Sequence, residues 1–332
     1  MTVPIVWAVA KRYPNVRITM LSRPFARPFF ENLAPNVNFM EADLKSEYKG
    51  IHGLNALYRR LTAKQFTHVA DLHSVLRSEY LRMRFNLGHF KVKHIDKHRK
   101  MRRMLVKHNH KQKKYLPTAF ENYTDVFTRL GFPINENDFR SIFQEESSYL
   151  NTLPDVIGEK HDDELWIGVA PFAAHLGKIY PPELMEQVIR QLTERYPKCR
   201  IFLFGRGKQE DEFFPKWTKE IPQCTNVGLH LETMRQELIL MAHLNVMLSM
   251  DSANMHMASL TGTKVVSVWG ATHPMAGFMG WRQNEENAIQ LDMDCRPCSI
   301  FGQKPCMYGD YRCLTGIKPE IIVEKISNII NF

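Results

Sequence analysis

A stretch in the second half of the chain carries residue types that could hold an anion. Residues 246–250 are apolar and predict a strand, which ends at Asp251 and Ser252. Both are preferred N-cap residues, and a helical pattern follows them. The backbone N–H groups of Ser252, Ala253 and Asn254 would then be unpaired at the carboxyl end of a strand. The helix dipole also favours an anion there, so this turn is a candidate phosphate site.

A histidine lies in the same predicted helix. His256 comes four residues after Ser252 and therefore one turn further along the same face. It could donate a hydrogen bond to a phosphate oxygen, while Asp251 could accept one from a hydroxyl group. The alternative is a helix capped by Ser252 and ended by Gly262, with the histidine hydrogen-bonded inside a core. From this segment alone, both interpretations stay open.

A lysine follows another predicted strand. Lys178 lies in the loop 171–181, just before a second helical pattern. A lysine in such a loop is more often solvated than functional. Across a crevice from a helix N-terminus, however, its mobile point charge would suit a diphosphate.

These residues need a scaffold that brings the ends of several strands together. Helical and strand patterns alternate along the chain, which predicts parallel sheets with helices on both faces. Ligands of such sheets bind in the crevice outside the carboxyl ends of the strands. We expect an N-terminal domain over residues 1–150 and a C-terminal domain over 160–332, joined by a polar connection. The predicted helices include 4–13, 26–33, 53–66, 181–197, 233–244 and 319–330, and the predicted strands include 16–22, 37–43, 67–72, 165–170, 199–204, 246–250 and 264–270.

Together these segments resemble glycosyltransferase family 9, the ADP-heptose:lipopolysaccharide heptosyltransferases. The resemblance implies an α/β fold of the GT-B class, with two Rossmann-like doubly wound domains facing a central crevice. Residues 1–150 would form the acceptor side and residues 160–332 the nucleotide-sugar domain. The family's residues stand in the stretch 248–274 at Asp251, Ser252, His256, Gly270, Thr272 and Pro274.

The resemblance also implies roles for particular residues. Lys178 matches the lysine of the family's donor loop, Glu210 is the expected ribose contact, and Thr272 belongs to the donor-binding turn. Ala253 replaces the usual glycine, so the backbone should approach a phosphate less closely. The amides after Ser252 would stabilise the leaving diphosphate together with the side chains of His256 and Lys178.

The implied activity is inverting transfer of heptose from ADP-heptose to the lipopolysaccharide inner core, with no metal or cofactor required for catalysis. Within enzymes, the alternative is a GT-B glycosyltransferase that uses another nucleotide sugar. A catalytically impaired protein that binds sugar nucleotides is a further alternative. A protein that binds nucleic acid is the alternative from a different class, and we expect no nucleic-acid partner because no RNA-binding or zinc-finger signature is present.

The start of the chain departs from the family pattern. Family members begin with a strand and a Gly-Asp turn whose aspartate is held to be the catalytic base, whereas this sequence begins directly on helix 4–13. We therefore expect strand 16–22 to lack a neighbour and the base to lie upstream of Met1. On this view the 332-residue chain is inactive or nearly so. If the base is instead present, Asp71 and His73 are the first residues to test.

The charge of the chain is concentrated in one stretch. The net charge is +9, and residues 82–114 hold thirteen Lys and Arg against a single acid, Asp96. Such a stretch is either a solvated face or a surface for an anionic partner. The family's acceptors carry carboxylate and phosphate groups, so an anionic lipopolysaccharide-core acceptor is the expected partner. With neither an apolar run of membrane length nor a secretion signal, we expect a cytoplasmic protein with peripheral contact to the inner membrane surface.

Four of the six cysteines are close together in sequence. Four thiolates at this spacing could bind a structural zinc ion, although the spacing is tighter than in common zinc ribbons. Free thiols and disulfides are the alternatives, and disulfides are unusual in the cytosol. In each case we expect the cluster to hold a loop in place and to take no part in catalysis. The cluster is Cys295, Cys298, Cys306 and Cys313.

Overall fold

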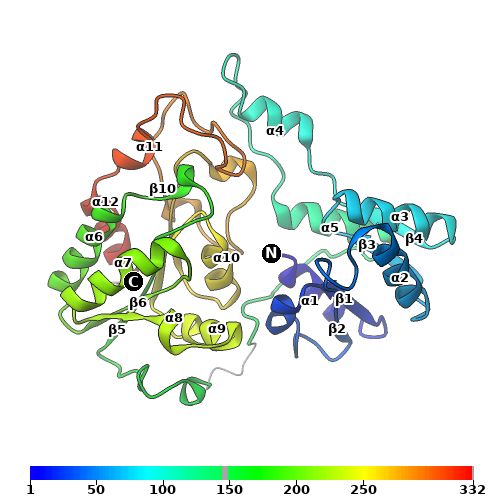
Figure 1. Ribbon diagram of the computed structural model, residues 1–332, viewed down its shortest axis with the longest axis horizontal. Coiled ribbons are helices and arrows are strands. Elements are labelled where there is room, and N and C mark those ends of the chain that lie inside the picture. The colour runs from blue at the N-terminus through cyan, green and yellow to red at the C-terminus, as the bar shows by residue number, and fades with distance from the viewer. Residues whose placement is uncertain (144–148, 331–332) are drawn as a thin grey trace. The chain divides into compact units, whose positions relative to one another are not determined.

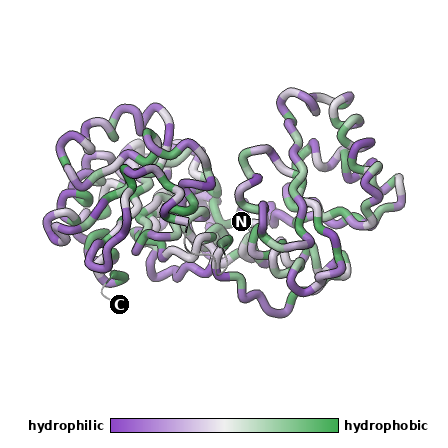
Figure 2. Tube along the Cα trace, turned by 90° about the horizontal axis from the view of Figure 1, so that it is seen from below, coloured by the Kyte–Doolittle hydropathy of each residue, from purple (hydrophilic) through white to green (hydrophobic). Residues whose placement is uncertain are grey.

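The computed structural model describes residues 1–143 and 149–330, which divide into two compact units (Figure 1). The N-terminal unit comprises Met1–His98 and Pro117–Ile142, and the C-terminal unit comprises Arg99–Leu116 and Phe143–Phe332. Along the trace, hydrophobic residues recur inside each unit and polar residues dominate the outer loops (Figure 2).

This division corrects the predicted domain boundary. The sequence placed residues 99–116 in the N-terminal domain, whereas the structure places them in the C-terminal unit. The reason is apolar packing: Leu105 and Leu116 are buried in one cluster with Ala276 and against Phe278. The basic stretch 82–114 is therefore divided between the two units.

The C-terminal unit is built on one parallel sheet whose strands are almost entirely buried. Its strand order is β10-β9-β8-β5-β6-β7, and all of the strand pairs are parallel. Apolar runs fit this position because strands covered on both faces need no polar side chains. The strands are β5 (Leu165–Ala170), β6 (Cys199–Leu203), β7 (Cys224–Asn226), β8 (Val246–Met250), β9 (Val265–Val268) and β10 (Ala288–Ile289).

Helices cover both faces of this sheet, so its predicted doubly wound architecture is confirmed (Figure 1). On one face, α6, α7 and α12 share a core cluster with alternate strand residues such as Ile167 and Val169. Elsewhere, α9 packs on α10, which contacts β8 and β9. The helices of this unit are α4 (Arg99–Leu105), α6 (Pro182–Arg195), α7 (Lys208–Glu220), α8 (Val227–His230), α9 (Met234–Ala242), α10 (Ala253–Leu260), α11 (Arg312–Thr315) and α12 (Pro319–Ile330).

The strand order fixes where a ligand would bind. From β5 the chain proceeds to β6 and β7 on one side, and then crosses to β8, β9 and β10 on the other. The carboxyl ends of β5 and β8 therefore flank the switch point of the sheet, which is where such folds bind their ligands.

The N-terminal unit has a different organisation. Its strands form two separate parallel pairs, β1 with β2 and β3 with β4, and within the described residues no strand joins the two pairs. Within the described residues β1 is paired with β2, and the strand expected on its other side stays a prediction. The predicted helix 26–33 is instead a 3-10 helix at Pro24–Phe29. The elements are α1 (Val3–Arg12), β1 (Ile18–Ser22), β2 (Val37–Glu41), α2 (Gly50–Thr62), β3 (His68–Asp71), α3 (Leu76–Leu87), β4 (Lys91–His94) and α5 (Ala119–Leu130).

Candidate functional site

An ion pair joins the loops that follow β5 and β8. Lys178 Nζ lies 2.8 Å from Asp251 Oδ2, and the two side chains are only 16% and 5% exposed. Lys178 ends a 3-10 turn that precedes α6, and Asp251 directly follows β8. Both residues were predicted as donor contacts, and the structure brings them together at the switch point. The Asp251 carboxylate positions the Lys178 ammonium group, whose other N–H groups could donate to an anion.

The N-terminus of α10 directly follows Asp251 in the chain. Ser252 is the N-cap residue, as predicted, but among the described contacts its side chain makes no capping hydrogen bond and lies 3.2 Å from Ser249 Oγ. The first N–H groups of the helix, including those of Ala253 and Asn254, are therefore not satisfied by that side chain. At its other end, Gly262 has a φ of +86°, which suits the predicted helix end. This N-terminus can receive an anion.

Two buried polar atoms near these strand ends have no hydrogen-bond partner in residues 1–143 and 149–330. They are His256 Nδ1 and Thr272 Oγ1. Burial lowers the pKa of His256 to about 3, and the charge of Lys178 adds to this effect. His256 is therefore neutral at pH 7 and keeps one ring N–H that can donate. Because unpaired buried polar atoms are costly, a polar ligand would stabilise this arrangement, and the alternative of a fully hydrogen-bonded core histidine is not what the structure contains.

Glu210 belongs to the helix that follows the neighbouring strand β6. It is in the first turn of α7, and its carboxylate packs over the glycines of the turn after β6. A Cβ atom added to Gly205 would lie 2.6 Å from Glu210 Oε1, and Gly205 has a φ of +139°. This turn therefore needs glycine both for its backbone and for the close approach of Glu210. The ribose contact of Glu210 stays a prediction.

The turn after β9 packs directly on the loop that carries Lys178. Ala271 N donates to Gly177 O at 2.7 Å. At Gly270, an added Cβ atom would lie 2.6 Å from the same carbonyl oxygen, so only glycine fits there. The family-like turn 270–274 thus positions the lysine loop as well as Thr272.

Arg296, which was not among the predicted site residues, holds this turn. Arg296 is 1% exposed, and its guanidinium donates to the carbonyl oxygens of Trp269 at 3.1 Å and Thr272 at 2.9 Å. In the sequence, Arg296 could have been noticed as an arginine between Cys295 and Cys298. We interpreted that stretch only as part of the cysteine cluster. The remaining acceptors of Arg296 are Gly270 O, Leu291 O and Gln290 Oε1.

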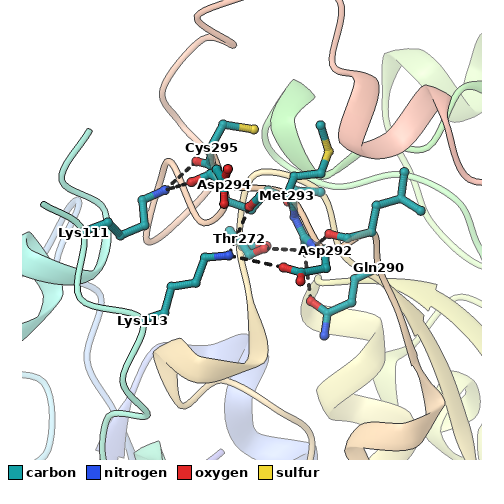
Figure 3. Close-up of polar contacts among 11 residues, drawn as sticks. Lys111, Lys113, Thr272, Gln290, Asp292, Met293, Asp294 and Cys295 are labelled. Atoms are coloured by element: carbon teal, nitrogen blue, oxygen red, sulfur yellow. Dashed lines mark hydrogen bonds and ion pairs between the residues drawn. The ribbon is translucent and has the colours of Figure 1, made fainter. Parts of the chain in front are cut away.

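Lysines of the basic stretch hold the neighbouring loop. Lys111 Nζ donates to the carbonyl oxygens of Asp294 at 3.0 Å and Cys295 at 2.7 Å, as Figure 3 shows. Lys113 Nζ lies 3.2 Å from Asp292 Oδ1. These two lysines, which we expected to face an anionic acceptor, are engaged with the C-terminal unit itself.

The four clustered cysteines line one small pocket together with Ala271 and Arg296. All four are free thiols, and burial raises the pKa of Cys313 to about 11. As the side chains lie, no group of three or more His, Cys, Asp or Glu residues in the described chain could hold a metal ion. The structural zinc site at Cys295, Cys298, Cys306 and Cys313 stays a prediction.

The fallback catalytic residues lie in the N-terminal unit, at the end of β3. Asp71 is buried, and its Oδ1 accepts hydrogen bonds from the backbone N–H groups of His73 at 3.0 Å and Ser74 at 2.8 Å. Its Oδ2 lies 3.3 Å from Arg82 Nε, close enough for an ion pair. Partial burial and the charge of Lys97 lower the pKa of His73. Asp71 thus caps a turn and neutralises an arginine.

Solved structures similar to this chain show its fold. The E. coli ADP-heptose lps heptosyltransferase II has a TM-score of 0.67 at 16% identity, covering 100% of this chain and 94% of that one. A glycosyltransferase family 9 protein from Veillonella parvula has a TM-score of 0.71 at 18% identity, covering 99% and 93%. The predicted GT-B class is confirmed by these likenesses.

The sequence comparisons show the family. Lipooligosaccharide heptosyltransferase 2 of Campylobacter jejuni is 26% identical over 137 residues, which are 39% of this chain. The matched region spans 40% of that relative's own length. The sequence pattern of glycosyltransferase family 9 (heptosyltransferase) matches residues 54–309, and the chain therefore belongs to glycosyltransferase family 9.

Proposed function

We propose that this protein transfers heptose, with inversion, from ADP-heptose to the inner core of lipopolysaccharide. The single observation that supports this best is the Lys178–Asp251 pair at the switch point, next to a helix N-terminus whose cap side chain makes no capping hydrogen bond. Membership of the heptosyltransferase family and the named substrates of similar proteins support the same donor. We propose that the transfer needs no metal ion or cofactor.

In this proposal the described residues act on the leaving group. An acceptor hydroxyl oxygen attacks the anomeric carbon as the bond from that carbon to the diphosphate oxygen breaks. Lys178 Nζ and the first N–H groups of α10 would stabilise the charge that develops on the departing ADP. Neutral His256 would donate its ring N–H, and Thr272 its hydroxyl, to phosphate or sugar oxygens. Glu210 would accept from the ribose hydroxyls.

The proton of the acceptor hydroxyl needs a base, whose position stays a prediction. Asp71 is a poor candidate because its Oδ1 already accepts two backbone hydrogen bonds and its Oδ2 lies 3.3 Å from Arg82 Nε. Among the described contacts the His73 ring makes none of this kind, but its lowered pKa weakens it as a base.

The test is donor-dependent turnover. The chain is incubated with ADP-heptose and a heptose-free lipopolysaccharide core, and release of ADP and the mass of the product are measured. Turnover with the inverted anomeric configuration would support the proposal. Turnover only with another nucleotide sugar would favour the alternative donor, and turnover without acceptor would indicate hydrolysis instead of transfer.

A second candidate function is binding of a sugar nucleotide without turnover. It is favoured by the engagement of Asp71, since the carboxylate first chosen as a substitute base is already paired. Calorimetry distinguishes the candidates: saturable binding of ADP with no product would indicate the second. Tight binding of oligonucleotides with no affinity for ADP would contradict both and support the nucleic-acid alternative.

The described part of the chain contains no helix with the length and apolar character needed to cross a membrane. We propose a cytoplasmic location with peripheral contact to the inner membrane, where a lipid-anchored acceptor would be presented.

A further inference from the structure

Helix α3 of the N-terminal unit has apolar side chains on two opposite faces. Phe85 is 3% exposed and packs in a core cluster with Leu57 and Leu61 of α2. Leu76, Met83 and Leu87, by contrast, are 85%, 51% and 72% exposed. An ordinary surface helix needs only the first of these faces.

The exposed row is straight and narrow. At about 100° per residue, Leu76, Met83 and Leu87 lie within about 40° of one another around the helix, nearly opposite Phe85. The row extends about 16 Å along the axis, since each residue adds about 1.5 Å. Three large side chains aligned in this way form an exposed apolar strip along one side of α3, which indicates a contact surface.

A polar cleft lies between α2 and α3. It has a volume of about 380 Å³ and is lined by His52, Asn55 and Arg59 of α2 and by Arg84 of α3. Asn55 Oδ1 accepts hydrogen bonds from Arg84 Nη1 at 2.8 Å and from Tyr80 OH at 2.8 Å. The Arg84 guanidinium also lies over the Tyr58 ring, 4.7 Å from its centroid. Arg84 is therefore held in place at the wall of the cleft, where its charge can meet an anion.

The charge of the surrounding segment matches an anionic surface. Residues 50–98, which contain both helices, hold nine Lys and Arg against three acids. The one acid in α3, Glu79, is paired with Arg82 at 3.2 Å. An exposed apolar strip on a surface of net positive charge favours contact with an anionic bilayer.

We propose that the α2–α3 face of the N-terminal unit binds the surface of an anionic lipid bilayer. Leu76, Met83 and Leu87 enter the boundary between headgroups and acyl chains, and the cleft lined by Arg59 and Arg84 receives a lipid phosphate. Nucleic acid offers phosphates but no apolar layer for the strip. The proposal does not depend on the proposed heptosyl transfer, because vesicle binding is measured without donor or acceptor.

The experiment is sedimentation of the full chain with vesicles. We expect binding to vesicles of equal parts phosphatidylglycerol and phosphatidylcholine, and at least tenfold weaker partition to phosphatidylcholine alone. The variant Leu76→Ser/Met83→Ser/Leu87→Ser should lose at least tenfold in partition while its circular dichroism stays unchanged. The matched control is Leu229→Ser, which replaces a side chain that is 76% exposed in the C-terminal unit and should bind vesicles as the wild type does.

A second set of variants tests the cleft. Arg59→Ala should lower the partition to phosphatidylglycerol vesicles several-fold, whereas Arg140→Ala, an exposed arginine on a loop of the same unit, should not. Wild-type protein that does not sediment with either vesicle would overturn the proposal, and so would a triple variant that binds as tightly as the wild type. Complete release by inorganic phosphate, relative to sodium chloride of equal ionic strength, would show that the cleft takes free phosphate and would overturn the assignment to lipid.

Discussion

The two units of this protein differ in how their parallel strands are joined. The C-terminal unit has one continuous sheet, and the N-terminal unit has two separate strand pairs. In the C-terminal unit, β5 is paired on both sides, by β6 and β8, so the loops that follow β5 and β8 are held side by side. In the N-terminal unit, β1 and β3 belong to separate pairs. A continuous parallel sheet brings side chains such as Lys178 and Asp251 to within 2.8 Å. Separate strand pairs give the residues at their ends no such common frame.

The largest expected difference between the units is in amide hydrogen exchange. Amides of β5 and β8, which are paired within a buried sheet, should exchange on the order of a thousandfold more slowly than those of β1 and β3. Exchange measured by mass spectrometry at the level of short peptides checks this. Equal protection in both units would mean that the strand pairs are as stable as the complete sheet.

Buried arginines offer the next comparison. Arg296→Ala should destabilise the C-terminal unit by about 3–5 kcal/mol, because it leaves several buried carbonyl groups without a donor. Arg82→Ala in the N-terminal unit should cost less, about 1–3 kcal/mol, because Asp71 keeps two backbone hydrogen bonds. Urea unfolding of both variants gives the two values. A larger loss of unfolding free energy for Arg82→Ala than for Arg296→Ala would contradict this ranking.

A third prediction concerns the ion pair at the switch point. Lys178→Ala should weaken ADP binding by about 1.5–3 kcal/mol, the range of a hydrogen bond to a charged group. Lys198→Ala serves as the control, since Lys198 is paired with Asp163 on the surface with a side chain that is 74% exposed. Calorimetry with ADP measures both. An unchanged affinity of the Lys178 variant would remove this lysine from the donor site.

The protonation of His256 gives a pH-dependent prediction. Its pKa is about 3 in the folded protein against an ordinary value of 6.5, so between these values the unfolded state binds a proton that the folded state does not. Stability should therefore fall as the pH is lowered from 6.5 towards 3, with no contribution from His256 above that range. His256→Gln should make this fall shallower, and thermal unfolding at pH 7 and pH 5 measures the slope.

The same variant addresses the role of His256. If the unpartnered ring faces a ligand, His256→Gln should reduce ADP affinity while changing the melting temperature at pH 7 by only a few degrees. A large loss of stability with intact ADP binding would favour a structural histidine.

The smallest expected effect belongs to the basic segment Arg99–Leu116. Lys113→Ala should change stability by less than about 1 kcal/mol, because Lys113 is 35% and Asp292 is 99% exposed, and salt screens such pairs. Lys111→Ala should cost somewhat more, since its Nζ donates to two carbonyl oxygens. Urea unfolding at low and high salt separates the two lysines. A strong salt dependence for Lys111→Ala alone would contradict this ranking.

Much of the C-terminal unit could be predicted because its signals are local. Apolar runs such as 246–250 form buried strands, Ser252 begins α10, and Gly262 supplies the positive φ after it. These outcomes depend on side-chain types and on the period of a few neighbouring residues. The N-terminal unit was harder to predict because α3 has an exposed apolar row, which obscures the usual amphipathic pattern.

The sequence by itself determined the family pattern, the doubly wound C-terminal sheet and the candidate donor residues from Lys178 to Thr272. Only the tertiary structure decided which of these residues touch, that Arg296 holds the turn at 270–272, and that Arg99–Leu116 belongs to the C-terminal unit. The physical reason is the distance in sequence between the residues that interact. Caps and strand periods are set by neighbours in the chain, whereas a buried guanidinium or a docked apolar segment is stabilised by partners far away in sequence. A local sequence pattern therefore cannot predict those partners.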